Sequence, residues 1–187
     1  LQLLGMDAWL AARPRNQGIR MVGFGGEHEL RWNGPHLPSF GSAAARWELD
    51  EALRLSAVTA GAEFIGGLKA VGADRGANGR VVAVHTTGDI SRIECQHLIV
   101  ADGVRSALGK ALGRVWHRNT VYGVAARAYV HSELHEDPWI TSHLELRDTE
   151  GRTLPGYGWI FPLGDGRVNI GVGSLATERC DSKVNLH

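Results

Sequence analysis

The spacing of apolar residues changes several times along the chain, and each change predicts a new element. Residues 3–11 and 46–60 place apolar side chains three or four positions apart, which predicts two helices. Gly61 is the expected end of the second helix. Alternation on both sides of a Gly-Gly pair predicts a hairpin over residues 19–32. A loop rich in proline and glycine, residues 33–42, follows that hairpin.

Short β segments dominate the rest of the chain. A short helix over residues 104–112 is expected to end at Gly113 and to divide these segments into two groups. The expected strands are residues 63–65, 68–73, 81–86, 90–94, 98–101, 121–130, 143–147, 156–162 and 167–173. We therefore expect a mixed α/β portion up to about Gly113, followed by an all-β portion with antiparallel strands.

Residues 155–173 carry the densest pattern in the sequence. Tyr157, Trp159 and Phe161 alternate with smaller residues, so a strand would point the three rings to one face. A two-residue turn at residues 165–166 would bring the valines and isoleucine of the next strand to that face, whereas a three-residue loop would reverse the match. The rings suit either a sheet core or a surface that holds an apolar ligand, and alternation leaves both open.

Composition excludes several functions. The chain has 20 basic and 20 acidic residues and no basic cluster, so neither nucleic acid nor an anionic membrane surface is indicated as a partner. No apolar run is long enough to cross a bilayer. Cys95 and Cys180 lie far apart, which argues against a zinc ribbon or a disulfide scaffold and fits a reducing, cytoplasmic location. Peripheral membrane attachment stays open.

Two glycine-containing motifs invite a nucleotide-binding interpretation. Asp102-Gly103 follows an apolar segment and precedes a short helix. A carboxylate at this place can accept hydrogen bonds from sugar hydroxyls, and a glycine lets backbone N–H groups approach a phosphate. The alternative is a helix cap. Residues 169–176 contain G-x-G-x-x-A, but too few residues follow for the helix, strand and acidic residue of a dinucleotide fingerprint. We predict that this second motif is the end of a hairpin.

A cluster of potential metal ligands occupies residues 131–137. Pro138 and the mixed charges of the cluster favour a solvated loop over a metal site. The candidate ligands are His131, Glu133, His135, Glu136 and Asp137.

Several segments, taken in order, resemble the geranylgeranyl reductase family. Residues 157–162 fit the Y-x-W-x-F-P part of the pattern P-x-x-Y-x-W-x-F-P, with Pro155 one position closer to the tyrosine than in that pattern. Residues 45–64 fit an R-x-x-L-D helix that precedes a strand, and residues 99–113 fit an Asp-Gly segment. Within that family the chain is most similar to the menaquinone reductases. Its R-x-x-L-D and Asp-Gly segments are also similar to those of the aromatic-ring hydroxylases.

The resemblance implies a fold and a set of site residues. The fold would be α+β or mixed α/β: the central fragment of an FAD-binding fold of the aromatic-hydroxylase type, with an antiparallel β substrate domain. Residues 1–17 and 46–113 would form a partial FAD-binding domain, 18–45 and 114–175 the substrate domain, and 176–187 a truncated C-terminal segment. FAD would contact Arg46, the backbone around Ala70, Asp102 and Gly103. The prenyl cavity would be lined in part by Tyr157, Trp159 and Phe161.

The activity implied is FAD-dependent reduction of a C=C bond in a polyprenyl chain, either of menaquinone or of a geranylgeranyl lipid. The resemblance identifies neither a catalytic proton donor nor the external electron donor, and it implies no metal. Two alternatives stay open: an FAD-dependent aromatic-ring monooxygenase, and a non-catalytic module that binds an apolar ligand.

Two segments of the family, an N-terminal G-x-G-x-x-G and a later Gly-Asp segment, are absent from this sequence. We therefore expect the 187-residue chain by itself to bind FAD weakly or not at all and to be inactive. The absorbance of flavin that co-purifies with the chain measures this, and a stoichiometric yellow complex would contradict it.

Overall fold

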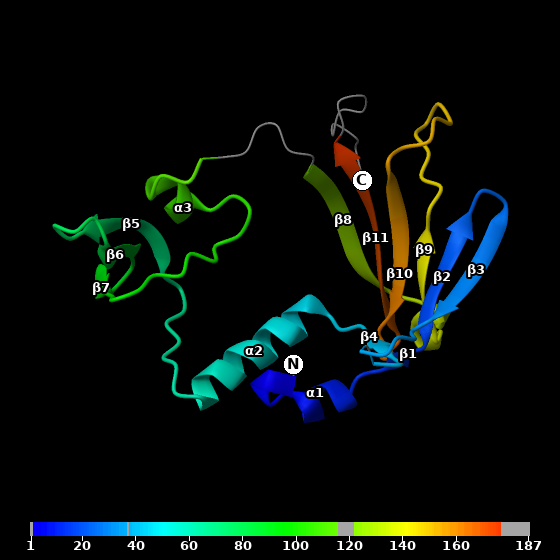
Figure 1. Ribbon diagram of the computed structural model, residues 1–187, viewed down its shortest axis with the longest axis horizontal. Helices are drawn as coiled ribbons and strands as arrows, with labels where there is room; N and C mark the ends of the chain where they lie inside the picture. The colour runs from blue at the N-terminus through cyan, green and yellow to red at the C-terminus, as the bar shows by residue number, and fades with distance from the viewer. Residues whose placement is uncertain (1, 37, 116–121, 177–187) are drawn as a thin grey trace. The chain divides into compact units, whose positions relative to one another are not determined.

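A computed structural model describes residues 2–36, 38–115 and 122–176, which form two compact units (Figure 1). Over the described residues, the first unit combines residues 2–36 and 38–62 with 122–176, and the second contains residues 63–115. The expected start of a strand at Val121 and the segment 177–187 lie outside the described residues. The assignment of domains to cofactor and substrate stays a prediction.

The α-helices of the first unit lie in its N-terminal half, together with a 3-10 turn and two short strands. The predicted first helix consists of a 3-10 turn and a short α-helix separated by Gly5, whose φ is +65°. The second helix ends before Gly61, whose φ of +98° confirms the predicted stop. These elements are η1 (Gln2–Leu4), α1 (Asp7–Ala11), β1 (Arg15–Asn16), β4 (Gly41–Ser42) and α2 (Arg46–Thr59).

A six-stranded sheet forms the larger part of the first unit. Its strand order is β3-β2-β9-β10-β11-β8 (Figure 1). The neighbouring strands are antiparallel, as predicted, except for the parallel pair β2–β9. The bounds are β2 (Gly18–Gly23), β3 (Gly26–Arg31), β8 (Tyr122–His131), β9 (Trp139–His143), β10 (Gly156–Pro162) and β11 (Arg167–Ala176).

The predicted hairpin β2–β3 is confirmed, but its turn lies one residue earlier than the Gly-Gly pair suggested. Gly23 pairs with Gly26, so Phe24 and Gly25 form the turn, with φ values of +53° and +76°. Two positive φ values are what the right-handed twist of a two-residue hairpin requires. The backbone N–H of Phe24 donates to Glu145 Oε2 at 2.7 Å, which helps to hold this conformation.

The most buried part of the sheet lies where the β10–β11 turn meets η2 (Glu133–Glu136). Leu163 and Val168 are buried there, at 6% and 2% exposure. The backbone N–H of Gly164 donates to the carbonyl of His135 at 2.8 Å, and the N–H of Ser132 donates to that of Gly166 at 3.1 Å. This packing fixes the end of the β10–β11 hairpin.

The second unit contains a three-stranded antiparallel sheet and a short helix. Its elements are β5 (Lys69–Arg75), β6 (Val81–Thr87), β7 (Arg92–Glu94) and α3 (Ala107–Ala111). The predicted strands at residues 63–65 and 98–101 do not form in the described structure. Both segments are apolar enough for a buried strand, but neither has a neighbouring strand here to receive its backbone hydrogen bonds.

Candidate functional site

Three aromatic side chains form a continuous surface on β10. Tyr157, Trp159 and Phe161 point to one face of the sheet, as alternation predicted. The ring centroids of Tyr157 and Trp159 are 5.6 Å apart, and those of Trp159 and Phe161 are 6.2 Å apart, which are favourable separations for aromatic pairs. Tyr157 is exposed, while the other two are half-buried. We call these three residues the aromatic wall.

The turn that follows the aromatic wall corrects one prediction. Leu163 pairs with Arg167, so the loop has three residues, 164–166, rather than the two assumed for an Asp-Gly turn. Both glycines of this loop have positive φ, +75° and +86°. The three-residue loop shifts the pairing of β10 with β11 by one residue. The valines and isoleucine of β11 therefore lie on the face of the sheet opposite the rings.

The glycines of β11 instead lie on the same face as the aromatic wall. Trp159 is opposite Gly171, and Tyr157 is opposite Gly173. A methyl group at Gly171 would overlap with the indole of Trp159, so the ring lies directly against the bare backbone. The indole Nε1–H of Trp159 donates to Asn169 Oδ1 at 3.2 Å. The backbone of Gly171 and the hydrogen bond to Asn169 thus fix the orientation of the indole.

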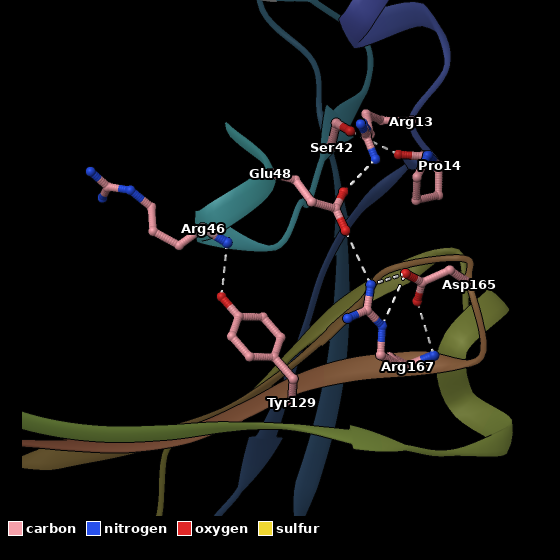
Figure 2. Close-up of polar contacts among 8 residues, drawn as sticks. All are labelled: Arg13, Pro14, Ser42, Arg46, Glu48, Tyr129, Asp165 and Arg167. Atoms are coloured by element: carbon pink, nitrogen blue, oxygen red, sulfur yellow. Dashed lines mark hydrogen bonds and ion pairs between the residues drawn. The ribbon is translucent and has the colours of Figure 1, made fainter. Parts of the chain in front are cut away.

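Arg46, a predicted FAD contact, is the first residue of α2. Its backbone N–H donates to the hydroxyl of Tyr129 on β8 at 3.0 Å (Figure 2). Trp47 packs against the same tyrosine, with centroids 4.5 Å apart and ring planes at 72°. The guanidinium of Arg46 points away from the sheet and pairs with Asp50 at 2.6 Å. The start of α2 is therefore held by backbone and ring contacts, which leaves the Arg46 side chain exposed.

Glu48, one turn into α2, connects three segments of the first unit (Figure 2). Its carboxylate accepts a hydrogen bond from Arg13 Nη1 at 2.6 Å and from Arg167 Nη2 at 3.1 Å. Arg167 also pairs with Asp165 in the β10–β11 loop. This carboxylate holds α2 against the hairpin that carries the aromatic wall. Sequence reasoning missed it because its partners lie 35 and 119 positions away.

We expect the pH dependence of stability to reflect the Asp165–Arg167 pair. The hydrogen bond from Arg167 lowers the pKa of Asp165 from its ordinary value. A lowered carboxyl pKa gives a contribution that is present above about pH 4 and is lost as the pH falls through the folded-state pKa. Asp165→Asn retains an acceptor for the backbone N–H of Arg167 but removes the charge. Its melting temperature should be below that of the native chain near neutral pH and converge with it in acid.

The matching measurement is thermal unfolding of both chains across the acid range. Asp165 is substantially exposed, so the two chains should differ in free energy of unfolding by less than about 1 kcal/mol near neutral pH. A separation that grows as the pH falls would contradict this account of the pair.

Asp102 and Gly103, in the second unit, lie beside a cavity of about 400 Å³. Asp102 Oδ2 accepts a weak hydrogen bond from the N–H of Leu108 at 3.3 Å, and Ser106 Oγ caps α3 by accepting from Gly109 at 2.9 Å. Hydrogen bonding from Ser106 lowers the pKa of Asp102, so this carboxyl stays ionised. Asp102 thus makes the capping contact and also lines a cavity, and its contact with a nucleotide stays a prediction.

Ala70, whose surrounding backbone is the remaining predicted FAD contact, lies on β5 opposite Thr86. The register between β5 and β6 shifts directly after it, between Ala70 and Gly72. It is not among the residues that line the cavity beside Asp102. The structure thus brings Asp102 and Gly103 together at one cavity, and it places Tyr157, Trp159 and Phe161 together on one strand.

The potential metal ligands of residues 131–137 do not converge. Residues 133–136 form the 3-10 helix η2 rather than the expected loop, because Ser132 caps the turn by accepting from the N–H of Leu134 at 3.2 Å. Over the part of the chain that the structure describes, no group of three or more such side chains could hold a metal ion. Residues 169–176 belong to the continuous strand β11, as predicted, and form no phosphate-binding loop.

Each helix in the described part of the chain falls short of the length and apolar character that a membrane span requires.

Comparison with known proteins gives the family. The model of the family described as "FAD binding domain" matches residues 2–164. The menaquinone reductase of Mycobacterium tuberculosis is 55% identical over 186 residues, which cover 100% of this chain and 45% of that protein. Digeranylgeranylglycerophospholipid reductase 1 of Methanopyrus kandleri is 29% identical over 177 residues, which cover 92% of this chain and 43% of that protein. The chain therefore spans less than half the length of these relatives.

A solved structure shows the same fold. A geranylgeranyl bacteriochlorophyll reductase-like protein from Thermoplasma acidophilum superposes with a TM-score of 0.69 at 24% identity, over 86% of this chain and 40% of that one. Flavin-dependent brominase Bmp2 superposes with a TM-score of 0.65 at 14% identity, over 95% of this chain and 44% of that one. The mixed α/β fold predicted from the sequence is thus that of flavin-dependent enzymes. The chain belongs to the FAD binding domain family, whose cofactor is FAD, and its relatives include the menaquinone and geranylgeranyl-lipid reductases.

Proposed function

We propose that this chain is part of an FAD-dependent reductase that saturates a C=C bond in a polyprenyl chain, of menaquinone or of a geranylgeranyl lipid. The observation that carries the proposal is the aromatic wall, in which three rings lie in sequence along one strand with Trp159 held against Gly171. A flexible apolar chain is best held by rigid rings, because they offer large contact area and lose little side-chain entropy on binding. The names of the two relatives support this substrate class.

The residues of this chain fit the cofactor that the family implies. Gly103 has a φ of +84° and open space where a Cβ would lie, so a ligand can approach its backbone closely. The ionised carboxylate of Asp102 is suited to accept hydrogen bonds from ribose hydroxyls. The exposed guanidinium of Arg46 is suited to a phosphate. We propose these three residues, with the backbone around Ala70, as FAD contacts.

The chemistry divides between cofactor and protein. Reduced FAD, when bound, supplies a hydride to one carbon of an isolated double bond, and a proton must reach the other carbon. The aromatic wall would orient the isoprene unit and exclude water from it. Tyr157, Trp159 and Phe161 are therefore proposed as substrate-binding residues rather than as proton donors.

The test uses the complete protein that contains this chain, purified with FAD and chemically reduced in the absence of oxygen. It is supplied with menaquinone, the quinol is re-oxidised in air afterwards, and the prenyl tail is examined by fragment mass spectrometry. A tail heavier by two hydrogens supports the proposal. An unchanged tail both in menaquinone and in a geranylgeranyl lipid supplied in the same way would show that the enzyme is not a prenyl reductase. A product that forms only with oxygen and contains an added oxygen atom would show the same.

A further inference from the structure

A cavity of about 290 Å³ lies at one end of the aromatic wall, within the first unit. Phe161 contributes to both the wall and the cavity. Asn169 is directly opposite Phe161 in the β10–β11 register, and Ile140 on β9 lies on the same face of the sheet. The cavity is lined by Asn16, Trp32, Gly41, Ser42, Ala43, Ala44, Ile140, Phe161 and Asn169. We call it the end cavity.

Two asparagines give the end cavity its polar character. Asn16 and Asn169 are more than nine-tenths buried, at 7% and 8% exposure. Each carbonyl oxygen accepts an indole N–H: Asn16 from Trp32 at 2.6 Å, and Asn169 from Trp159 at 3.2 Å. An indole can only donate, so these bonds fix the orientation of both amides. The two NH₂ groups then have no acceptor among the described residues.

The sequence is adapted locally to this arrangement. A Cβ on Gly41 would lie 2.5 Å from Asn16 Oδ1 and 2.8 Å from Trp32 Nε1, so only glycine leaves room for their hydrogen bond. The NH₂ nitrogens of both asparagines are not among the fully buried unpaired atoms, so they reach the open space of the cavity and can donate to a ligand oxygen there.

The chemistry of the end cavity selects among possible ligand groups. None of the described residues that line it carries a positive charge, so an anionic phosphate would lose its hydration there without compensation. Its size is at the lower end of small-molecule sites, about 300–1,000 Å³, so it suits one ring system rather than a long chain. The rest of the lining consists of rings, apolar residues and Ser42, whose hydroxyl donates to the carbonyl of Pro14 at 3.0 Å. An uncharged, flat group with carbonyl oxygens fits all three properties.

We propose that the end cavity binds the quinone ring of a prenylated quinone, with the amides of Asn16 and Asn169 donating hydrogen bonds to its carbonyl oxygens. This inference rests on the proposed function and deepens it, because it selects the quinone over a phosphate-bearing lipid as the substrate headgroup. The prenyl tail leaves the cavity past Phe161 and continues along Trp159 and Tyr157. Asn16 and Asn169 are substrate-binding residues in this arrangement.

The test is calorimetric titration of the complete, FAD-loaded protein with two probes. One is a dimethylated naphthoquinone without a prenyl tail, and the other is a polyprenyl alcohol without a ring. Asn16→Asp and Asn169→Asp retain the acceptor for the indole and remove the NH₂ donors, and Asn169→Leu removes the amide altogether. Asn78→Asp is the matched control, because Asn78 lies in a turn of the second unit and uses its oxygen to accept from Arg80 N–H.

We expect each cavity variant to weaken naphthoquinone binding by about tenfold, the loss of one hydrogen bond, with little change for the polyprenyl alcohol. Asn78→Asp should change neither affinity, and thermal unfolding of each variant verifies that it is folded. Naphthoquinone binding that is unaffected by all three variants would overturn the proposal.

The outcomes also separate this inference from the function on which it rests. Asparagine-dependent naphthoquinone binding in a protein that leaves prenyl tails unreduced would support the end cavity and refute the reductase. Tail reduction with naphthoquinone binding indifferent to the asparagines would support the reductase and refute the end cavity.

Discussion

Gly171→Ala is expected to destabilise the first unit by about 1–3 kcal/mol and to displace the Trp159 ring. The added methyl group would overlap with the indole and would also lie 2.7 Å from the backbone oxygen of Ala126. The backbone oxygen belongs to the neighbouring strand β8 and cannot move without disturbing the sheet. The indole must therefore tilt away, which breaks its hydrogen bond to Asn169. Urea unfolding measures the stability, and tryptophan fluorescence reports the change at the ring.

Gly158→Ala is the matched control for this prediction. Gly158 lies on β10, and a Cβ there would meet its nearest neighbours at 3.5 and 3.7 Å, which are ordinary contacts. We expect this variant to unfold within about 0.5 kcal/mol of the native protein. Equal effects of the two substitutions would contradict the conclusion that the indole lies against Gly171.

Trp159→Ala is expected to weaken the binding of a prenyl ligand by about tenfold to a hundredfold. The indole is the middle ring of the aromatic wall, with Tyr157 and Phe161 on its two sides. Its removal takes away the apolar contact of a large side chain, about 1.5–3 kcal/mol, and leaves Tyr157 and Phe161 without a shared neighbour. Titration of the complete protein with a polyprenyl alcohol measures the affinity.

Trp159→Phe serves as the comparison for that variant. It retains a ring on the wall but removes the donor to Asn169. We expect it to recover most of the affinity for the polyprenyl alcohol, because that ligand depends on the apolar surface. If Trp159→Ala and Trp159→Phe weaken binding of the polyprenyl alcohol equally, the ring at this position does not provide the contact with the ligand.

Local pattern was sufficient to predict α2, the strands β2, β3, β8, β10 and β11, and the alternation of the three rings. It was wrong for β9, which it placed at residues 143–147 rather than at Trp139–His143. The helix α2 follows from apolar spacing and the glycine at its end, and the rings of β10 share a face because strand geometry fixes alternation. Neither property depends on distant contacts. The resemblance to the geranylgeranyl reductases then supplied the cofactor and the family, which the comparisons confirm.

Pairing between strands was harder to predict, because a loop longer by one residue shifts the register and changes which side chains of the two strands share a face. Asp165-Gly166 suggested a two-residue turn, but Gly164 also adopts a positive φ and donates to His135 in η2. Packing of the loop on η2 therefore selects the longer loop. The result moves Gly171 beneath Trp159, which the sequence alone did not indicate.

The contacts that build the end cavity and the Glu48 cluster could not be found from sequence. Asn16 and Trp32 meet because the β2–β3 pairing continues to the hydrogen bond from Trp32 N–H to the carbonyl of Gln17. The β1–β4 pairing then brings Gly41 opposite Asn16. Glu48 reads as an ordinary acidic residue in the first turn of a helix until Arg13 and Arg167 are brought to it by the fold. Such sites depend on long-range topology rather than on local spacing.

The central claim is that the aromatic wall of this chain contacts the prenyl tail. It is tested most directly by photo-crosslinking the complete, FAD-loaded protein to a prenylquinone with a photoreactive diazirine in its tail, followed by peptide mapping. The account predicts that the label attaches to β10 at Tyr157, Trp159 or Phe161 and that excess unlabelled prenylquinone competes with it. Labelling confined to the valines and isoleucine of β11, on the opposite face of the sheet, would contradict it.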